Sequence, residues 1–313
     1  MRVAITGGCG FIGSHVVDHL LRVGHQVSVI DLGSRWINPG AEYRHADLFD
    51  EEALSAAVAG ADAVFHLAGA SDVNDVAADP VQAVRLNVEG TARVLEATRR
   101  AGASRFLLAS TVWVYGAAVG RGELTEEAPV DLRRPGHVYV ATKLAAEMLV
   151  HSYRQMFGLR YTILRYGIPY GPRMREALVV ARFVRAALDG QPITIAGTGE
   201  QQRNYVYVED LADAHVRALA PVAADQTLAL EGGTPVSVRE IADMVCSLVR
   251  PVAVRHTQAR AADYESVSIS ARLAKELLDW SPVTSFATGV RQYLDWLAGT
   301  EAKGDADIVE ALP

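Results

Sequence analysis

The chain of 313 residues has only two cysteines and no surplus of positive charge. Cys9 and Cys246 are too few for a disulfide framework and show no zinc-binding spacing, so no metal site is expected. The 30 basic residues are outnumbered by 37 acidic ones, giving a net charge of −7. This balance argues against a nucleic-acid-binding protein, which needs a basic face, although a few well-placed arginines can still bind a phosphate-bearing small molecule.

Long apolar runs, internal repeats and low-complexity segments are also absent. No apolar run reaches the roughly 20 residues of a membrane-spanning helix, and no basic leader precedes the first apolar run. We therefore expect a cytoplasmic protein that does not bind a membrane. Half of the residues are hydrophobic, which in a chain of this length allows a sizeable core in one large or two modest domains.

The first half of the chain alternates short apolar runs with helical patterns. The runs typical of strands buried on both faces are Val3–Thr6, Val27–Asp31, Ala63–Leu67, Arg105–Ser110 and Thr162–Arg165. The helical patterns between them are Ile12–Val23, Ala53–Ala59, Pro80–Arg100 and Val138–Phe157. Strict alternation of strand and helix implies parallel pairing, so we predict a doubly wound parallel α/β sheet, the Rossmann fold.

After about Arg165 the pattern loosens and glycine and proline become frequent. Further helices are predicted near Ala177–Asp189, Asp210–Ala220, Ser237–Val249 and Ser270–Asp279. We expect a Rossmann domain over residues 1–166 and a smaller mixed α/β substrate-binding domain over 167–298, with some of its segments returning to the first domain. The second domain would cap the carboxyl edge of the sheet, where open α/β sheets bind ligands. Residues 299–313 are predicted to be a mobile tail.

A glycine loop connects the first predicted strand to the first predicted helix. Gly7 allows a tight turn, Gly10 lets the backbone approach a pyrophosphate, and Gly13 lets the helix pack closely on the sheet. The pyrophosphate would then lie at the positive N-terminus of the helix. Cys9 lies inside this loop, where a helix N-terminus could lower the pKa of its thiol, although a simple space-filling role is the plainer interpretation.

The second predicted strand ends in an acidic residue, Asp31. It lies 18 residues after Gly13, close to the spacing of about 20 at which a carboxylate binds the adenosine ribose of a dinucleotide. Such a carboxylate repels a 2′-phosphate, so NAD is favoured over NADP. Two alternatives stay open: Asp31 could merely cap a turn, and the nearby Arg35 could serve a 2′-phosphate.

Tyr139 and Lys143 are four residues apart on a predicted helix, and so lie on one of its faces. A free tyrosine titrates near pH 10, and a neighbouring ammonium group is expected to lower that pKa. Tyr139 is thus a candidate proton shuttle, and Lys143 a candidate for holding the nicotinamide ribose. A surface pair of no consequence is the alternative, since this spacing occurs by chance in many helices.

Several motifs together resemble the extended short-chain dehydrogenase/reductase family. They are TGGCGFIG at Thr6–Gly13, HLAG at His66–Gly69, NVEGT beginning at Asn87, STVWVYG at Ser110–Gly116 and YVATK at Tyr139–Lys143. The later RYGIPYGPR at Arg165–Arg173 and GTGEQQRNYVYVEDLA at Gly197–Ala212 resemble the branch of NAD-dependent nucleotide-sugar epimerases and dehydratases. The likeness to UDP-glucose and UDP-glucuronate 4-epimerases runs from Arg2 to about Leu297.

The resemblance implies roles for individual residues. Thr111 would hydrogen-bond the reacting sugar hydroxyl beside Tyr139, Asp47 and Leu48 would flank the adenine, and Asn87 would support the active-site helix. Arg203 and Arg260 match positions at which relatives bind the substrate diphosphate with arginine, and Asp263 would position Arg260; a solvated surface arginine is the alternative for Arg260. The remaining residues implied to bind NAD are Phe11, Ile12, Leu67, Ala68 and Gly69.

The two residues after Thr111 bear on the reaction. Dehydratases of the family carry Asp-Glu there, and decarboxylating relatives tend to keep a glutamate, whereas this chain has Val112 and Trp113. Neither side chain can carry a proton. This favours 4-epimerisation of a nucleotide-diphosphate sugar, with UDP as the first nucleotide to consider, through a transient 4-keto intermediate.

Departures from the family pattern fall around the substrate. Ile168 stands where relatives commonly have an asparagine, and the segments Asp72–Val76 and Pro135–Tyr139 lack their usual serines. A sugar other than glucose or galactose, such as a uronic acid or a deoxysugar, stays open. A sugar carboxylate could meet His137, Arg173 and Arg175, although ordinary loop or helix positions are the plainer interpretation of each.

Other functions are also compatible with this sequence, and the resemblance bears on the oligomeric state. An NAD(P)-dependent reductase or dehydrogenase of a non-nucleotide carbonyl would use Thr111, Tyr139 and Lys143 but should not need Arg203, and a dehydratase of a related substrate is a further alternative. A coenzyme-sensing protein without catalysis would typically have lost the tyrosine or the lysine. The resemblance also implies a homodimer formed by the helices after Pro80 and after Tyr139. Val140, Leu144 and Met148 could serve that contact or the core.

Overall fold

A seven-stranded parallel sheet forms the centre of the computed structural model, which describes residues 1–116, 123–133, 136–258 and 269–301. Its strand order is β10-β6-β5-β4-β1-β2-β3, and every neighbouring pair is parallel. The strands are β1 (Arg2–Thr6), β2 (Gln26–Asp31), β3 (Glu42–His45), β4 (Ala63–His66), β5 (Arg105–Thr111), β6 (Tyr161–Tyr166) and β10 (Gln226–Leu230). The predicted doubly wound α/β fold is confirmed.

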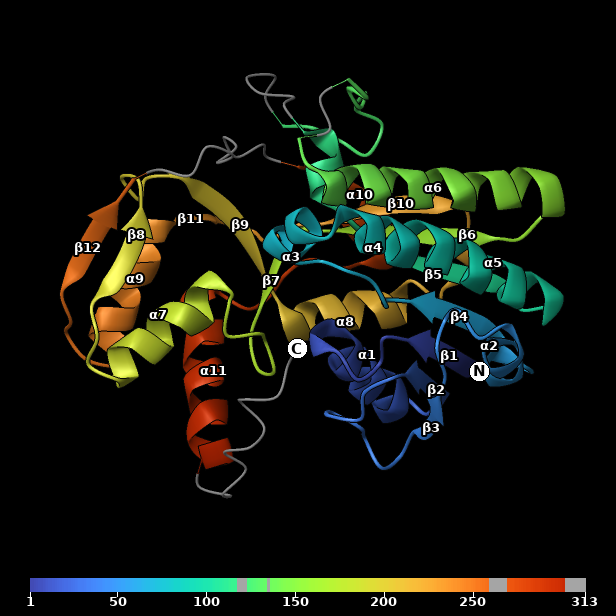
Figure 1. Cartoon of the computed structure of the whole chain (residues 1–313), viewed down its shortest axis with the longest axis horizontal. Helices are drawn as coiled ribbons and strands as arrows, with labels where there is room; N and C mark the ends of the chain where they lie inside the picture. The colour runs from blue at the N-terminus through green and yellow to red at the C-terminus, as the bar shows by residue number, and fades with distance from the viewer. Residues whose placement is uncertain (117–122, 134–135, 259–268, 302–313) are drawn as a thin grey trace.

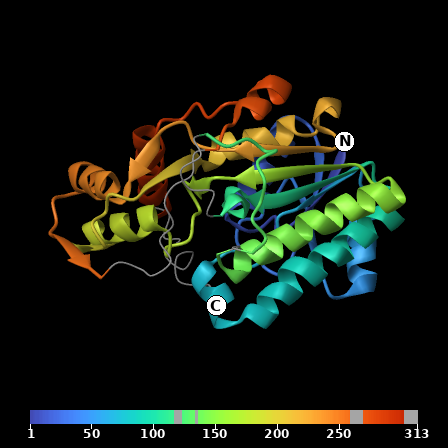
Figure 2. The same cartoon turned by 90° about the horizontal axis from the view of Figure 1, so that it is seen from above.

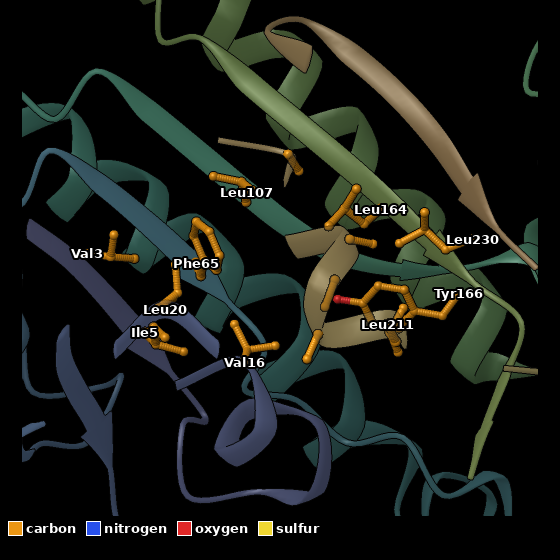
Figure 3. Packing of buried hydrophobic residues seen from close by; sticks show 14 of the residues in the cluster. Val3, Ile5, Val16, Leu20, Phe65, Leu107, Leu164, Tyr166, Leu211 and Leu230 are labelled. Atoms are coloured by element: carbon orange, nitrogen blue, oxygen red, sulfur yellow. The ribbon is translucent and has the colours of Figure 1, made fainter. Parts of the chain in front are cut away.

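Helices cover both faces of this sheet (Figure 1). One face is covered by α1 (Phe11–Arg22), α8 (Val208–Arg217) and α10 (Arg272–Leu278), the other by α2 (Glu51–Val58), α5 (Gly90–Arg100) and α6 (Val138–Phe157). Successive side chains of a strand point to opposite faces, so Val3 and Ile5 pack into the first core and Ala4 into the second. Figure 3 shows the first core, where Val16 and Leu20 of α1 meet Phe65 of β4.

The second half of the chain contributes to this sheet and also builds a smaller lobe. Two small sheets form the lobe, one of β7 (Ile168–Tyr170), β9 (Gln202–Tyr207) and β11 (Pro235–Ser237), the other of β8 (Ile193–Ala196) and β12 (Val254–Thr257). They pack with α7 (Val179–Leu188), α9 (Val238–Leu248) and α11 (Phe286–Glu301) around a third core (Figure 2).

The segment predicted as one helix over Pro80–Arg100 is interrupted. It consists of α4 (Pro80–Val84), a π-helical turn η1 (Arg85–Glu89) and α5. Such turns are rare and often occur at functional sites. The turn contains Asn87, whose side chain is fully occupied by neighbouring segments, as described below.

Several short elements of the smaller lobe were not predicted, and one boundary was wrong. The strands β7, β8, β9, β11 and β12 are only three to six residues long and give little periodic signal. Helix α11 ends at Glu301, so the segment 299–301 is helical rather than part of a tail; residues 302–313 lie outside the described residues. Among the described residues, no helix is both long and apolar enough to cross a membrane.

Candidate active site

The glycine loop brings three backbone segments very close together. Gly7 has a φ of +74°, and a Cβ atom there would lie 2.6 Å from the backbone nitrogen of Ala68. A Cβ atom on Gly13 would lie 2.1 Å from the carbonyl oxygen of Gly7. Helix α1 then begins at Phe11, and no side chain caps its first N–H groups. Only glycine fits these positions, and the N-terminus of α1 has no side-chain cap, which fits the pyrophosphate of a dinucleotide.

Asp31 lies at the carboxyl end of β2, beside the glycine loop. Its two carboxylate oxygens accept hydrogen bonds from the backbone N–H groups of Cys9 (2.9 Å) and Gly33 (3.1 Å). The Arg35 guanidinium lies over the Trp36 ring, 5.1 Å from its centroid. Burial and the neighbouring Asp31 raise the pKa of the Cys9 thiol to about 12, so Cys9 is no activated thiolate.

The loop after β4 passes between the glycine loop and α6. The Leu67 N–H donates to the Thr6 carbonyl, Ala68 touches Gly7, and a Cβ atom on Gly69 would lie 3.6 Å from Lys143 Nζ. At the carboxyl end of β3, Leu48 is buried, and the Asp47 side chain accepts a hydrogen bond from the Phe49 N–H.

Asn87 joins this loop to α6 from its place in the π-helical turn. Its Oδ1 accepts from the Ala70 N–H (2.7 Å), and its Nδ2 donates to the Ala70 carbonyl and to the Thr142 hydroxyl (both 2.9 Å). Because the side chain is buried, these bonds are protected from water. Asn87 therefore fixes the loop after β4 against the first turns of α6.

Thr111, Tyr139 and Lys143 come together at the carboxyl edge of the sheet. Thr111 ends β5, and the other two residues lie in the first turns of α6. A hydrogen bond connects the side chains of Tyr139 and Thr111. Lys143 Nζ donates to the Ala109 carbonyl at 3.1 Å and lies 6.0 Å from the centroid of the Tyr139 ring. All three side chains are buried.

Burial governs the ionisation of this group. It raises the pKa of Tyr139 to about 12, although the hydrogen bond with Thr111 and the charge of Arg175 act in the opposite direction. It lowers the pKa of Lys143 to about 8, against the charge of Glu147. The expectation that Lys143 lowers the pKa of Tyr139 is therefore wrong for this structure, because loss of solvation outweighs the nearby charges.

A buried ion pair below this group was not predicted from the sequence. The Glu147 carboxylate accepts from the Arg165 guanidinium through both oxygens (2.6 and 3.0 Å) and from the Ser110 hydroxyl (2.5 Å). Arg165 Nη1 also donates to the Tyr115 hydroxyl at 2.6 Å. Arg165 ends a predicted apolar strand, and a charge at such a position needs a buried partner. This was the one signal in the sequence from which the pair could have been predicted.

Aromatic and basic side chains surround Tyr139. The rings of Trp113 and His137 lie 6.2 and 6.0 Å from the Tyr139 ring, measured between centroids. Arg175 lies close enough to lower the Tyr139 pKa and contacts Asp72. Arg173 instead extends to α1, where it forms an ion pair at 2.8 Å with Asp18. Of the three residues suggested for a sugar carboxylate, His137 and Arg175 are near Tyr139.

The predicted substrate arginines are not brought together by the described structure. Arg203 lies on β9, opposite Val236 of β11, and donates to the Gln202 carbonyl. Arg260 and its suggested partner Asp263 lie outside the described residues. Ile168 lies on β7 opposite Tyr205 of β9.

A second buried carboxyl group near the carboxyl edge of the main sheet was also not predicted from the sequence. Glu231 follows β10 directly and is only 4% exposed. Burial raises its pKa to about 8, although hydrogen bonds from the Asn204 side chain and the Gly232 N–H lower it.

Comparisons with known proteins identify the family of this chain. The model of the NAD-dependent epimerase/dehydratase family matches residues 3–229. A UDP-glucose 4-epimerase of Mycolicibacterium smegmatis is 32% identical over 95% of this chain and 98% of its own length. A dTDP-glucose 4,6-dehydratase of Streptomyces niveus is 30% identical over 96% of this chain and 94% of its own.

A solved structure extends the agreement to the fold. The UDP-glucose 4-epimerase of Thermotoga maritima, determined with UDP-glucose, superimposes with a TM-score of 0.90 at 29% identity and covers 96% of this chain and 100% of its own. The NAD cofactor expected from the glycine loop and Asp31 is confirmed by the family. The chain belongs to the NAD-dependent epimerase/dehydratase family of nucleotide-sugar enzymes.

Proposed function

We propose that this enzyme is a 4-epimerase of a nucleotide-diphosphate sugar, with UDP-glucose and UDP-galactose as the first substrates to test. The observation that carries the proposal is the pair Val112 and Trp113, which follows Thr111 at the place where the resemblance puts the acid and base of a dehydratase. The relatives from M. smegmatis and T. maritima support the same reaction.

In this proposal the carboxyl edge of the sheet holds the cofactor. The glycine loop with Phe11 and Ile12 binds the pyrophosphate, and Asp31 binds the adenosine ribose. Adenine lies between Asp47 and Leu48, while Leu67, Ala68, Gly69 and Asn87 shape the nicotinamide side. NAD, when bound, supplies the reversible oxidation of the sugar carbon and the positive charge of its oxidised ring.

The chain's own residues handle the proton of the sugar hydroxyl. Tyr139 takes this proton and later returns it, and Thr111 holds the same hydroxyl in place. Lys143 binds the nicotinamide ribose and adds positive charge near the phenol. Because burial keeps Tyr139 neutral in the protein alone, its phenol first has to release its own proton to solvent. The positive charges of Arg175, Lys143 and bound NAD favour the phenolate, which then takes the sugar proton.

The remaining assignments belong to the same proposal. Arg203 and Arg260 bind the diphosphate, with Asp263 positioning Arg260. The substrate-binding domain spans residues 167–298, and the Rossmann domain 1–166, with β10 returning to its sheet. The protein acts in the cytoplasm as a homodimer built from α4, α5 and α6.

The test is turnover of a panel of UDP-, dTDP-, GDP- and CDP-sugars, followed by NMR. We expect inversion at C4 of UDP-glucose or UDP-galactose without net reduction of the coenzyme. Tyr139→Phe should lower kcat by about 10²–10⁴-fold. Tyr153→Phe, on the outer part of the same helix, is the matched control and should leave kcat unchanged.

Each alternative gives a different product. A 4-keto-6-deoxy sugar would indicate a dehydratase with His137 as a proton carrier, since its imidazole stacks on Tyr139. Net consumption or formation of NADH would indicate a reductase or dehydrogenase. If the protein binds NAD but converts no sugar in the panel, the result would favour a coenzyme-sensing protein without catalysis.

A further inference from the structure

A buried carboxyl oxygen near Thr111 has no partner within the described part of the chain. It is Oε2 of Glu231, and the Oδ1 atom of Asn204 is in the same situation. A buried polar atom without a hydrogen bond is rare in folded proteins, because its lost solvation is not replaced. Two such oxygens on neighbouring side chains therefore point to a missing ligand.

The register of the main sheet places Glu231 at the same edge of the sheet as the catalytic group. Thr111 of β5 lies opposite Tyr166 of β6, which lies opposite Leu230 of β10. Glu231 is the next residue after Leu230, and a Cβ atom on Gly167 would lie 3.0 Å from its Oε2. Adjacent strands are about 4.8 Å apart, so Glu231 lies roughly two strand spacings from Thr111. Figure 3 shows Tyr166 and Leu230 side by side.

The residues beside Glu231 are less buried than Glu231 itself. Glu231 itself is covered, whereas Gly167, Ile168 and Asn204 beside it are partly exposed. Ile168 replaces the asparagine that relatives commonly have, so its side chain offers no polar group here. Asn204 and Glu231 supply polar atoms to this corner instead.

The two oxygens have complementary hydrogen-bonding properties. The Asn204 side chain hydrogen-bonds to the Glu231 carboxyl, so the free oxygens lie on one small patch. The amide oxygen can only accept. The carboxyl group is largely protonated at neutral pH because burial raises its pKa to about 8, so its free oxygen can donate.

A hydroxyl group satisfies this patch and a carboxylate does not. A hydroxyl donates one hydrogen bond to Asn204 Oδ1 and accepts another from Glu231. A carboxylate has no proton to donate, so it leaves the amide oxygen unpaired and places a second acid beside Glu231. The patch therefore selects a neutral sugar over a uronic acid.

We infer that Glu231 and Asn204 form a specificity pair that hydrogen-bonds one hydroxyl group of the bound sugar and disfavours a sugar carboxylate. The inference rests on the proposed function, since it concerns the sugar of that same site. It assigns the pair to the sugar and not to the nucleotide, because the pair lies beyond the ends of β6 and β10, in line with Thr111.

Calorimetric titration of the NAD-loaded enzyme with UDP-glucose, UDP-glucuronate and UDP tests this inference. Glu231→Ala should weaken UDP-glucose binding about ten- to a hundredfold and leave UDP binding within about twofold. Glu231→Gln keeps a donor and should lose less. The wild-type preference for UDP-glucose over UDP-glucuronate should shrink in Glu231→Ala.

Asp210→Asn is the matched control. Asp210 is also a buried carboxyl group, but its oxygens accept hydrogen bonds from Val283 and Thr284, so its loss should leave the UDP-glucose to UDP affinity ratio unchanged. Equal weakening of UDP and UDP-glucose by Glu231→Ala, or unchanged binding, would overturn the specificity pair, as would a wild-type preference for UDP-glucuronate. Since binding is measured without turnover, a failure of epimerisation would be seen separately.

Discussion

Burial pushes the ionisable side chains near Thr111 towards their neutral forms. The pKa of Tyr139 rises to about 12, that of Glu231 rises to about 8, and that of Lys143 falls to about 8. Each shift has loss of solvation as its largest cause. Because these groups are poorly solvated, charges brought by a ligand act strongly on them.

The Glu231 carboxyl should make stability depend on pH. Its folded-state pKa of about 8 lies above the ordinary value of 4.5, so its contribution to stability is complete below pH 4.5 and is lost as the pH rises to about 8. The free energy of unfolding in urea is measured at pH 5 and at pH 8 for wild type and Glu231→Gln. From pH 5 to pH 8, the value for wild type should fall relative to that for Glu231→Gln by an amount on the order of a few kcal/mol. An equal change in both proteins would contradict the raised pKa.

Helix α6 is the element on which the proposed catalytic side chains depend. Its inner face carries Tyr139 and Lys143, and one turn further Glu147 binds Arg165 of β6 and Ser110 of β5. The helix is thus attached to two neighbouring strands by one buried carboxylate. Asn87 attaches the start of the same helix through Thr142.

Removing one partner of the buried ion pair should lower the free energy of unfolding far more than removing both partners. Glu147→Leu leaves the Arg165 charge unpaired, so the free energy of unfolding in urea should fall by about 3–5 kcal/mol. The double variant Glu147→Leu with Arg165→Met should recover most of this loss. Glu89→Leu, which breaks the solvent-exposed pair with Arg93, is the control and should change stability by less than about 1 kcal/mol. Additive losses in the double variant would show that the two charges do not depend on each other.

At the scale of the whole molecule, one helical face carries exposed apolar side chains. Val81 and Val84 on α4 and Met148 on α6 are 78%, 46% and 62% exposed, and the two helices lie side by side (Figure 1). Val140 is instead buried in a small core with Tyr139. The three candidates from the sequence therefore differ: Val140 packs inside, Leu144 is partly buried, and Met148 is open to a partner.

A charged side chain introduced on this face of α4 and α6 should dissociate the proposed dimer. Met148→Glu should shift the mass measured by light scattering after size exclusion from dimer to monomer, because two such charges would meet at a symmetric contact. Val283→Glu alters a more exposed side chain, 84% exposed, that precedes α11, and should leave the mass unchanged. A monomeric wild-type protein, or a dimeric Met148→Glu variant, would contradict this interface.

Much of the fold was predictable because its signals are local. The alternation of apolar runs and helical patterns identified five of the strands in the main sheet and the carboxyl edge at which Thr111 lies. The glycine loop was found by its spacing between a predicted strand and helix, and the pair Tyr139 and Lys143 by its spacing on a predicted helix downstream of that loop. Such features depend on residues close together in the chain, and a sequence displays them directly.

What escaped prediction depends on partners far apart in the chain. No sequence pattern near Glu231 predicts that this acid is buried, since a polar residue before two glycines is typical of an ordinary turn. The direction of the Tyr139 pKa shift was also missed, because spacing reveals the neighbouring ammonium group but not the extent of burial. The π-helical turn at Asn87 depends likewise on contacts with Ala70 and Thr142.

The late position of β10 in the chain has a consequence for synthesis of the protein. Six strands of the sheet can pair once residue 166 has left the ribosome, yet β6 keeps an open, apolar edge until Gln226–Leu230 has also emerged. An unpaired strand edge of this kind invites association between nascent chains. A product ending shortly after β6 would carry the whole glycine loop and still be prone to aggregate.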